Sequence, residues 1–220
     1  MVNKLLIFDM DGTVLDTLSD LTSALNYALA KNGLPARTTG EVRGFVGNGI
    51  RRLIERGVPD GTDVSLINAV HADFTFFYEL HCADATAPYP GVREAVAALR
   101  ARGYLTAVVS NKADYAVQKL VARYFPGDFD FAAGETQSVR RKPAPDMVFA
   151  ALSALGVTQD YAVYVGDSEV DLETAGNAGI PCISVTWGFK DRSFLLAHGA
   201  KTLVDRPEDL PEALRRMQLQ

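Results

Sequence analysis

The sequence predicts an α/β fold in which a doubly wound parallel sheet carries an inserted helical domain. Short apolar runs of strand length alternate with segments whose apolar residues recur at helical spacing, a pattern typical of parallel sheets covered by helices. Glycines stand just past most of these helical segments, where they accept the left-handed backbone that ends a helix. One long segment, residues 17–87, breaks the alternation because it contains helical patterns and no convincing strand.

Five apolar runs predict the strands of the sheet. The first run, Lys4–Phe8, is stopped by Asp9 and has the continuous apolar character of a strand buried on both faces. The other four predicted strands are Tyr104–Val109, Phe129–Ala133, Tyr161–Val165 and Cys182–Thr186. Helical segments separate them, and such crossovers connect parallel strands.

Four helices are predicted between and after these strands. They are Val92–Arg102, Ala113–Tyr124, Asp146–Leu155 and Glu169–Ala178. Gly103, Gly156 and Gly179 follow three of them as stop signals. The core predicted from these elements is Rossmann-like and comprises residues 1–16 and 88–220.

The segment 17–87 is predicted to be a helical cap domain. Its predicted helices are Leu18–Asn32, Ile50–Arg56 and Val64–Asp84, with a loop at Gly47-Asn48-Gly49 before the second of them. Asp16-Thr17 and the turn-rich segment Pro88–Gly91 would be the hinges that connect the cap to the core.

The composition excludes several function classes. The 220 residues are 48% hydrophobic and 22% charged, which is ordinary for a globular protein. The net charge of −5 argues against nucleic acid as a partner, and no apolar run is long enough to span a membrane. The apolar run at the N-terminus is too short for a signal peptide, so we expect a cytoplasmic protein. Two distant cysteines, Cys82 and Cys182, are expected to be reduced thiols.

Polar residues follow three of the predicted strands directly. Asp9 and Asp11 follow the first strand, Ser110, Asn111 and Lys112 the second, and Gly166-Asp167-Ser168 the fourth, with Asp171 four positions after Asp167. Each cluster alone could be turn chemistry or a helix cap. Because ligands of open parallel sheets bind beyond the carboxyl ends of the strands, we expect the three clusters to converge on one site.

This set of side chains has a chemistry of its own. Carboxylates brought close together require a cation, and oxygen ligands favour Mg²⁺. A carboxylate can also attack phosphorus to form an aspartyl-phosphate, while a second carboxylate serves as acid and base. Lys142, between basic residues and prolines, could supply positive charge to the phosphoryl oxygens, although one lysine in a basic run could equally be a solvated surface residue.

Four short motifs, in order along the chain, resemble those of the haloacid dehalogenase superfamily. They are Asp9-Met10-Asp11-Gly12-Thr13, Val109-Ser110-Asn111, Lys142-Pro143 and Gly166-Asp167-Ser168-x-x-Asp171. The resemblance covers Lys4 to about Gly188 and includes a helical cap after the first motif. Met10 stands where phenylalanine is common, and both residues are apolar.

The resemblance implies a role for each matching residue. Asp9 would be the nucleophile and Asp11 the general acid and base. Ser110, Asn111 and Lys142 would bind the substrate, with Lys142 also counted as catalytic. Mg²⁺ would be bound by Asp9, the Asp11 backbone carbonyl and Asp167, with Asp171 contacting it through water or a neighbouring ligand.

Softer features resemble the phosphoglycolate phosphatases within that superfamily. These features are Val46–Gly49 with Leu53-Ile54, Ser110–Lys112 and Thr186-Trp187-Gly188. They imply hydrolysis of 2-phosphoglycolate to glycolate and phosphate. If the cap loop faces the site, the backbone N–H groups of Gly47–Gly49, with Arg51 or Arg52 nearby, could bind the anionic tail of the substrate; Gly49 and Arg51 are the candidates for this contact. Gly47-Asn48-Gly49 could also be a bare turn between helices.

Other functions remain open at the level of sequence. A phosphatase for a nucleoside monophosphate, a sugar phosphate or pyrophosphate would share every catalytic residue, and a sugar phosphomutase would keep both Asp9 and Asp11. Asp11 argues against a dehalogenase, which needs neither this acid nor a metal. A catalytically dead binding module is disfavoured because no position of the four motifs is replaced.

Overall fold

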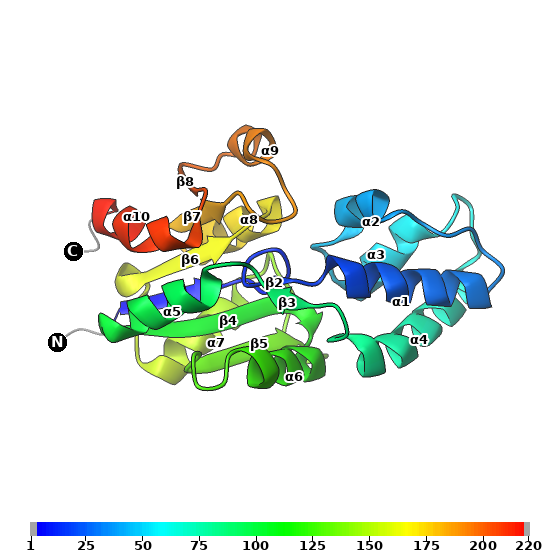
Figure 1. Cartoon of the computed structure of the whole chain (residues 1–220), viewed down its shortest axis with the longest axis horizontal. Coiled ribbons are helices and arrows are strands. Elements are labelled where there is room, and N and C mark those ends of the chain that lie inside the picture. Colours follow the sequence, from blue (N-terminus) through cyan, green and yellow to red (C-terminus); the bar gives the residue numbers. More distant parts are fainter. Residues whose placement is uncertain (1–3, 218–220) are drawn as a thin grey trace. The chain divides into compact units, whose positions relative to one another are not determined.

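The computed structural model of the chain describes residues 4–217, and the chain divides into two compact units. One unit holds the residues up to Leu15 together with those from Pro88 onward, and the other is the inserted segment Asp16–Ala87. In Figure 1 the inserted unit is coloured from blue to cyan. Within residues 4–217, no helix combines the length and the apolar character needed to cross a membrane.

The first unit contains a six-stranded parallel sheet, which confirms the predicted fold class. Its strands lie in the order β5-β4-β1-β6-β7-β8. Their bounds are β1 (Lys4–Phe8), β4 (Tyr104–Ala113), β5 (Phe131–Glu135), β6 (Ala162–Gly166), β7 (Cys182–Val185) and β8 (Thr202–Val204). β1 lies between β4 and β6, with β4 and β5 on one side of it and β6, β7 and β8 on the other. The order of the strands reverses at β1, and open sheets bind ligands at such a switch point.

The register of the sheet brings the ends of the central strands to one level. Phe8, the last residue of β1, lies opposite Val108 of β4 and Val165 of β6. The residues that follow these positions therefore emerge at the same edge of the sheet. This is the edge at which the sequence places its three polar clusters.

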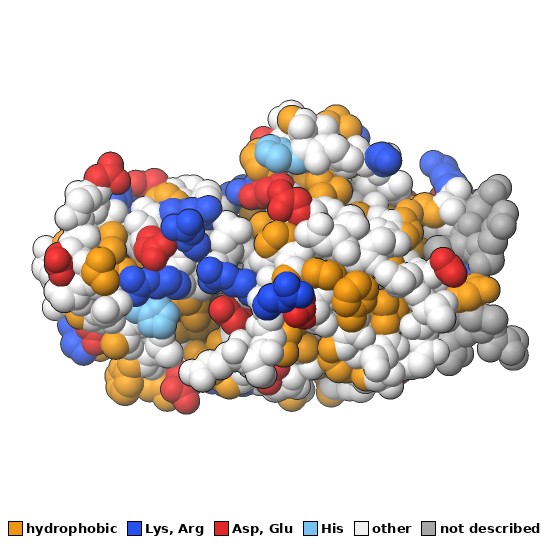
Figure 2. Space-filling model, turned by 180° about the vertical axis from the view of Figure 1, so that it is seen from behind, with side chains coloured by type: hydrophobic (Ala, Val, Ile, Leu, Met, Phe, Trp, Pro, Cys, Tyr) orange, Lys and Arg blue, Asp and Glu red, His pale blue; other side chains and the backbone are white. Residues whose placement is uncertain are grey.

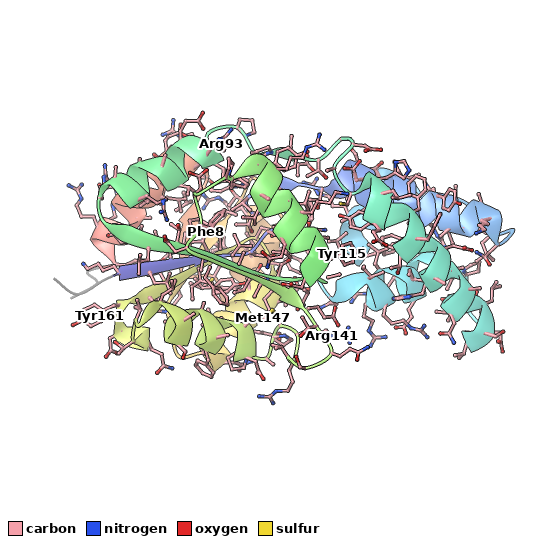
Figure 3. All side chains as sticks on the ribbon, turned by 90° about the horizontal axis from the view of Figure 1, so that it is seen from below. Phe8, Arg93, Tyr115, Arg141, Met147 and Tyr161 are labelled. Carbon is pink, nitrogen blue, oxygen red and sulfur yellow. The ribbon has the colours of Figure 1, made fainter. Side chains whose placement is uncertain are left out.

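Helices cover both faces of the sheet. Figure 3 shows α7, which carries Met147, on one side of the strands and α5, which carries Arg93, on the other. The helices of this unit are α5 (Val92–Ala101), α6 (Asp114–Tyr124), α7 (Asp146–Leu155), α8 (Glu169–Asn177), α9 (Arg192–Ala197) and α10 (Leu210–Arg216). Short 3-10 helices precede β6 at Gln159–Tyr161 and α10 at Pro207–Asp209.

The core of this unit forms because the sheet strands are apolar on both faces. Met147, Val148 and Ala151 of α7 pack in one buried cluster with Ile7 of β1 and Tyr164 of β6. Continuous burial of this kind fixes the strands that carry the polar residues at their ends.

The inserted unit is helical and has its own core. Its helices are α1 (Leu18–Lys31), α2 (Thr39–Phe45), α3 (Gly49–Gly57) and α4 (Val64–His81). α1 and α4 pack against each other, with Tyr27 stacked on Phe77 at 4.3 Å between ring centroids. Gly57 lies so close to α1 that a Cβ there would come within 2.9 Å of Leu25.

A buried carboxylate ties the start of this unit to its end. Asp20 of α1 accepts hydrogen bonds from the backbone N–H groups of Ala85 and Thr86 and from the Thr86 hydroxyl, at 2.7 to 3.1 Å. At the two passages between units, β2 (Leu15–Asp16) and β3 (Ala87–Pro88) pair as a two-stranded sheet.

The surface carries charges of both signs. Figure 2 shows Lys and Arg side chains interspersed with Asp and Glu side chains over the face that it displays. Ion pairs such as Lys31–Asp73 and Arg206–Asp209 join oppositely charged side chains of the surface. This face therefore carries both positive and negative side chains, as expected for a chain with 22 basic and 27 acidic residues.

Some predicted boundaries are wrong. β4 extends through the polar residues after Val109 to Ala113, because Ala113 still pairs with Glu135 of β5. β5 begins at Phe131 instead of Phe129, whose ring packs in the core against Phe8 and Phe125 from a loop position. β8 was not predicted because the strand is only three residues long. α2, α9 and α10 were not predicted individually.

Candidate active site

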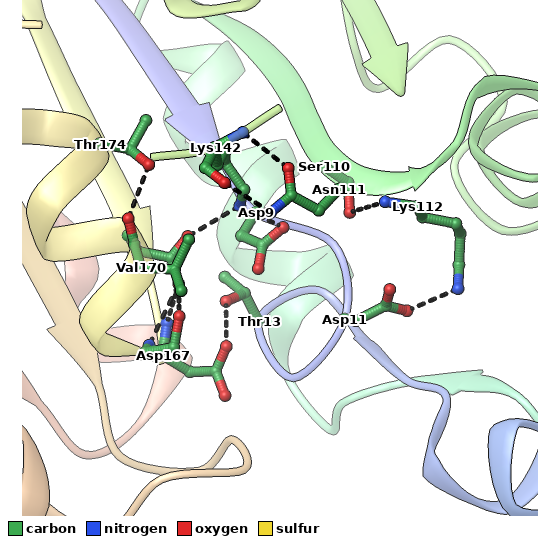
Figure 4. A network of polar contacts seen from close by, with 12 residues as sticks. Asp9, Asp11, Thr13, Ser110, Asn111, Lys112, Lys142, Asp167, Val170 and Thr174 are labelled. Carbon is green, nitrogen blue, oxygen red and sulfur yellow. Dashed lines mark hydrogen bonds and ion pairs between the residues drawn. The ribbon is translucent and has the colours of Figure 1, made fainter. Parts of the chain in front are cut away.

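The three polar clusters converge at the expected edge of the sheet. Asp9 follows β1, Asp167 follows β6, and Ser110 lies in the extended end of β4; all three are buried. Figure 4 shows them around the loop that follows β1, together with Lys142, which comes from the segment before α7. Asp9 and Asp167 are thus neighbours although 158 positions separate them along the chain.

Lys142 is a buried cation in contact with two carboxylates. Its Nζ lies 2.8 Å from Asp9 Oδ1 and 2.8 Å from Asp171 Oδ1, and it donates to the Tyr164 hydroxyl at 2.9 Å. Burial by itself lowers the pKa of Lys142, but the Asp171 and Asp9 carboxylates outweigh it and hold that pKa well above its ordinary value. Lys142 is therefore a fixed positive charge beside Asp9 and not a solvated surface residue.

Asn111 positions Lys142 through the backbone. Its side-chain Nδ2 donates to the Lys142 carbonyl at 3.0 Å, and its Oδ1 accepts from the Lys142 N–H at 2.7 Å. Asn111 was predicted to bind substrate, and these bonds give its side chain the task of fixing the segment that carries the ammonium group. The peptide bond between Lys142 and Pro143 is cis.

Asp167 is held by donors from two loops. Its Oδ1 accepts from the Thr13 hydroxyl at 3.2 Å, and its Oδ2 accepts from the Phe189 N–H at 2.6 Å. Gly12 and Gly188 crowd the same carboxylate, since a Cβ at either position would come within 2.5 Å of Asp167 Oδ2. Only glycine fits there, and the Gly12 backbone has a φ of 87°.

Asp171 is bonded to the protein through both carboxylate oxygens. Oδ1 accepts from Lys142 Nζ and from the Tyr164 hydroxyl, while Oδ2 accepts from the N–H groups of Asp167 and Ser168 and from the Ser168 hydroxyl. These contacts make Asp171 the anchor of Lys142 and of the turn into α8.

The charges at this edge fit a divalent cation. Oxygen atoms of Asp9, Asp167 and Asp171 lie within 4.8 Å of one another. Burial raises the pKa of Asp9 to about 7, opposed by Lys142 and reinforced by the Asp171 and Asp11 carboxylates. Burial, with Asp171 and Asp9, also raises the pKa of Asp167 well above its ordinary value.

The composition of the site points the same way. The four carboxyl groups of Asp9, Asp11, Asp167 and Asp171 outnumber the two lysines, Lys112 and Lys142, so acidic groups are in excess. A hard cation with oxygen ligands would cancel this excess, and Mg²⁺ has that chemistry. Asp9 and Asp167 are the side chains that fit it, because each oxygen of Asp167 accepts one protein hydrogen bond, whereas the two oxygens of Asp171 accept two and three.

Asp11 contacts a second buried lysine. Lys112 Nζ lies 3.0 Å from Asp11 Oδ1, and the Lys112 side chain is only 2% exposed. In the view of Figure 4, Asp11 and Lys112 stand on one side of Asp9 and Asp167 stands on the other. From the sequence, Lys112 is one of three polar residues after a predicted strand, and no role was predicted for it.

The two predicted cap residues lie in the inserted unit. Gly49 is the first residue of α3 and has a φ of 80°, which glycine adopts without strain. Arg51 pairs with Glu55 at 2.9 Å and donates to Asn68 Oδ1 at 2.6 Å, both within this unit. Their predicted contact with substrate stays a prediction.

Sequence reasoning missed several residues that support the site. Thr13 and the Phe189 N–H hold Asp167, Tyr164 contacts both Lys142 and Asp171, and the Trp187 indole donates to the Thr13 carbonyl at 3.0 Å. Thr13 and Trp187 lie in motifs that resemble those of the superfamily, and this could have marked them as site residues. Tyr164 reads as an ordinary apolar strand residue.

Comparison with known families gives one match over most of the chain. The sequence profile of the haloacid dehalogenase-like hydrolases matches residues 6–185. This range includes Asp9, Ser110, Lys142 and Asp167, the four positions that the fold brings together.

Individual relatives span nearly the whole chain. A phosphoglycolate phosphatase from Mesorhizobium japonicum is 35% identical over 87% of this chain and 86% of its own length. An N-acetylmuramic acid 6-phosphate phosphatase from Pseudomonas aeruginosa is 30% identical over 97% of this chain and 95% of its own length. Among solved structures, a candidate phosphoglycolate phosphatase from Lactobacillus delbrueckii superposes with a TM-score of 0.92 at 42% identity, covering 97% of this chain and 99% of that one.

Proposed function

The chain belongs to the haloacid dehalogenase-like hydrolase family and is a phosphoric monoester hydrolase, and we propose that its substrate is 2-phosphoglycolate. In this proposal the protein uses Mg²⁺ and an aspartyl-phosphate intermediate to release glycolate and phosphate. The observation that carries the phosphoryl-transfer mechanism is the buried Lys142 ammonium group 2.8 Å from Asp9 Oδ1. It is a fixed cation beside a carboxylate that can attack phosphorus.

The first half of the reaction transfers the phosphoryl group to Asp9. A carboxylate oxygen of Asp9 forms a bond to phosphorus while the bond from phosphorus to the ester oxygen breaks. Asp11 donates its proton to the departing oxygen, so the hydroxyl group of glycolate leaves in its neutral form. Lys142 and the Ser110 hydroxyl hold the phosphoryl oxygens during the transfer.

The second half returns Asp9 to its starting state. Asp11, now a carboxylate, takes a proton from a water molecule whose oxygen attacks phosphorus. The bond between phosphorus and the Asp9 oxygen breaks, and inorganic phosphate leaves. When bound by Asp9, Asp167 and the Asp11 carbonyl, Mg²⁺ would supply positive charge that offsets the repulsion between these carboxylates and the phosphate.

The helical unit is proposed to act as a cap that selects substrate, with Gly49 and Arg51 as the residues that read the anionic tail. Support comes from the family membership and from the position of Gly49 at the N-terminus of α3, where backbone N–H groups are available to anions. A cytoplasmic location belongs to the same proposal, and both cysteines are free thiols.

A panel of phosphate esters with Mg²⁺ tests the function. Release of free phosphate should be most efficient, by kcat/KM, for 2-phosphoglycolate over glucose 1-phosphate, pyrophosphate and a nucleoside monophosphate. A kcat/KM tenfold higher for another ester would leave the phosphatase activity standing and show that 2-phosphoglycolate is not the preferred substrate. Isomerised sugar phosphate without phosphate release would indicate a mutase.

A sugar phosphate is the second candidate substrate. The Pseudomonas aeruginosa relative, which matches nearly the full chain, is named for a phosphorylated amino sugar. Including N-acetylmuramic acid 6-phosphate in the panel decides between the two candidates by their kcat/KM values.

A further inference from the structure

We propose that Lys112 is a further specificity residue, in addition to Gly49 and Arg51 of the cap, and binds the carboxylate of the substrate next to the leaving oxygen. This inference rests on the proposed phosphatase function and deepens it, because it names the chemical class of leaving group. That class is the 2-hydroxy acids, in which the carboxyl carbon is bonded to the carbon that carries the phosphorylated oxygen.

Lys112 is not needed for the charge balance at phosphorus. Lys142 already places an ammonium group 2.8 Å from Asp9. Lys112 instead contacts Asp11 at 3.0 Å, and its side chain is 2% exposed. Burying a second ammonium group is costly, and such a cation is expected to have a specific anionic task.

The Lys112 ammonium group lies beside the residue proposed to protonate the leaving oxygen, Asp11. Asp11 must come within hydrogen-bond distance of the leaving oxygen to protonate it. A cation in contact with Asp11 is therefore close to whatever substituent the leaving oxygen carries. In 2-phosphoglycolate the leaving oxygen is bonded to a CH₂ group that carries a carboxylate, and this carboxylate is the group that the proposal assigns to Lys112.

Lys112 also lies on the side of the site away from Asp167. In Figure 4, Lys112 and the Asp11 side chain stand on one side of Asp9 and Asp167 stands on the other. A substrate with its phosphoryl group at Asp9 can therefore direct its other end toward Lys112 without approaching the Asp167 carboxylate. An ammonium group has three N–H donors, so one lysine can contact Asp11 and a substrate carboxylate at once.

Backbone geometry keeps Lys112 in place. It lies within β4, and its N–H donates to the Ser110 hydroxyl at 3.3 Å. A Cβ at Gly134 of the neighbouring strand would lie 2.5 Å from the Lys112 carbonyl oxygen, so the two strands are in close contact at this point. The ammonium group is thus presented from a strand and not from a loose loop.

The test compares two esters that differ in one group. 2-Phosphoglycolate and 2-hydroxyethyl phosphate have the same phosphoryl group and chain length, but the second carries a neutral hydroxymethyl group in place of the carboxylate. Lys112→Met keeps the volume of the side chain and removes its charge. We expect the ratio of kcat/KM for the first ester over the second to fall by about thirtyfold or more, the factor typical of a lost buried charge pair.

The alternative is that Lys112 acts only by orienting Asp11. In that case Lys112→Met would slow both esters equally and leave the ratio unchanged, which would overturn the proposal. Lys119→Met, which removes an exposed lysine from α6, is the matched control and should leave the ratio as in the wild type.

A measurement on the wild type keeps the proposal testable if Lys112→Met does not fold. The wild type should prefer 2-phosphoglycolate over its uncharged amide, phosphoglycolamide, by a similar factor. Equal kcat/KM for acid and amide would overturn the role of Lys112 while leaving the phosphatase intact. No phosphate release from any ester would instead overturn the proposed function itself.

Discussion

Asn111 and Lys142 are joined by a pair of hydrogen bonds from one side-chain amide to both polar groups of one residue's backbone. The two residues are 31 positions apart, and the pair fixes the segment whose ammonium group lies beside Asp9. The end of β4 thus determines where the phosphoryl-binding cation stands. Catalysis should therefore be sensitive both to the Lys142 ammonium group and to the Asn111 side chain that positions it.

Lys142→Met should lower kcat/KM for 2-phosphoglycolate by about a hundredfold or more, the scale for loss of one preorganised charge-stabilising group. Phosphate release measures the effect. Arg140→Met is the matched control, because Arg140 is two positions away and its side chain is 78% exposed. A loss below about threefold in Lys142→Met would mean that this lysine does not contact the transferring group.

Asp9→Asn should reduce turnover by about a thousandfold or more, since an amide does not attack phosphorus. The wild type mixed briefly with substrate and quenched in acid should gain the mass of one phosphoryl group, and Asp9→Asn should gain none. Asp160→Asn makes the same change at an exposed position and should behave as the wild type. Near-normal turnover of Asp9→Asn would indicate direct attack by water.

Chelation of divalent cations should abolish turnover, and added Mg²⁺ should restore it. Binding should also raise the melting temperature of the wild type by roughly 5 °C or more when Mg²⁺ is well above its dissociation constant. Asp167→Asn should lose most of this thermal shift because it removes one of the proposed ligands. Full activity in EDTA, or an equal shift in Asp167→Asn, would contradict the assignment.

Asp11→Asn should affect the first chemical step in proportion to how strongly the leaving oxygen needs a proton. The alkyl oxygen of phosphoglycolate is basic and needs it, whereas the aryl oxygen of p-nitrophenyl phosphate hardly does. Single-turnover release of glycolate should therefore collapse, while the burst of p-nitrophenol should fall much less. Equal losses would show that Asp11 serves structure or metal binding instead.

Asp20→Ala should destabilise the helical unit, because it leaves the buried donors of Thr86 and the N–H group of Ala85 without their acceptor. We expect the free energy of unfolding to fall by about 2–3 kcal/mol, as for hydrogen bonds to a buried charged group. Urea denaturation measures the change. Asp60→Ala, at an exposed position of the same unit, should change it by less than about 0.5 kcal/mol.

Much of the core could be predicted from the sequence because its signals are local. The run Lys4–Phe8 is apolar throughout and ends at Asp9, so both the strand and the position of its carboxylate follow from neighbouring residues. Parallel strands place their ends at one edge, which is why the convergence of Asp9, Ser110 and Asp167 could be expected without coordinates.

The residues that escaped prediction owe their roles to contacts between distant segments. Tyr164 has the sequence signature of a buried strand residue, and only the approach of Lys142 gives its hydroxyl a task. Asn111 was expected to face substrate, since a sequence does not show that the Lys142 backbone lies opposite it. β8 has too few residues for a periodic pattern and forms because β7 offers it a partner.

The pairing of β2 with β3 brings the entry and the exit of the inserted segment together. An insertion whose two ends are adjacent imposes little constraint on its host, whatever its length or internal structure. The catalytic fold could therefore keep its strand order and its carboxylates while the insertion is lengthened, shortened or exchanged over evolutionary time. New substrates would then be acquired by replacing a module, with the phosphoryl-transfer chemistry inherited unchanged.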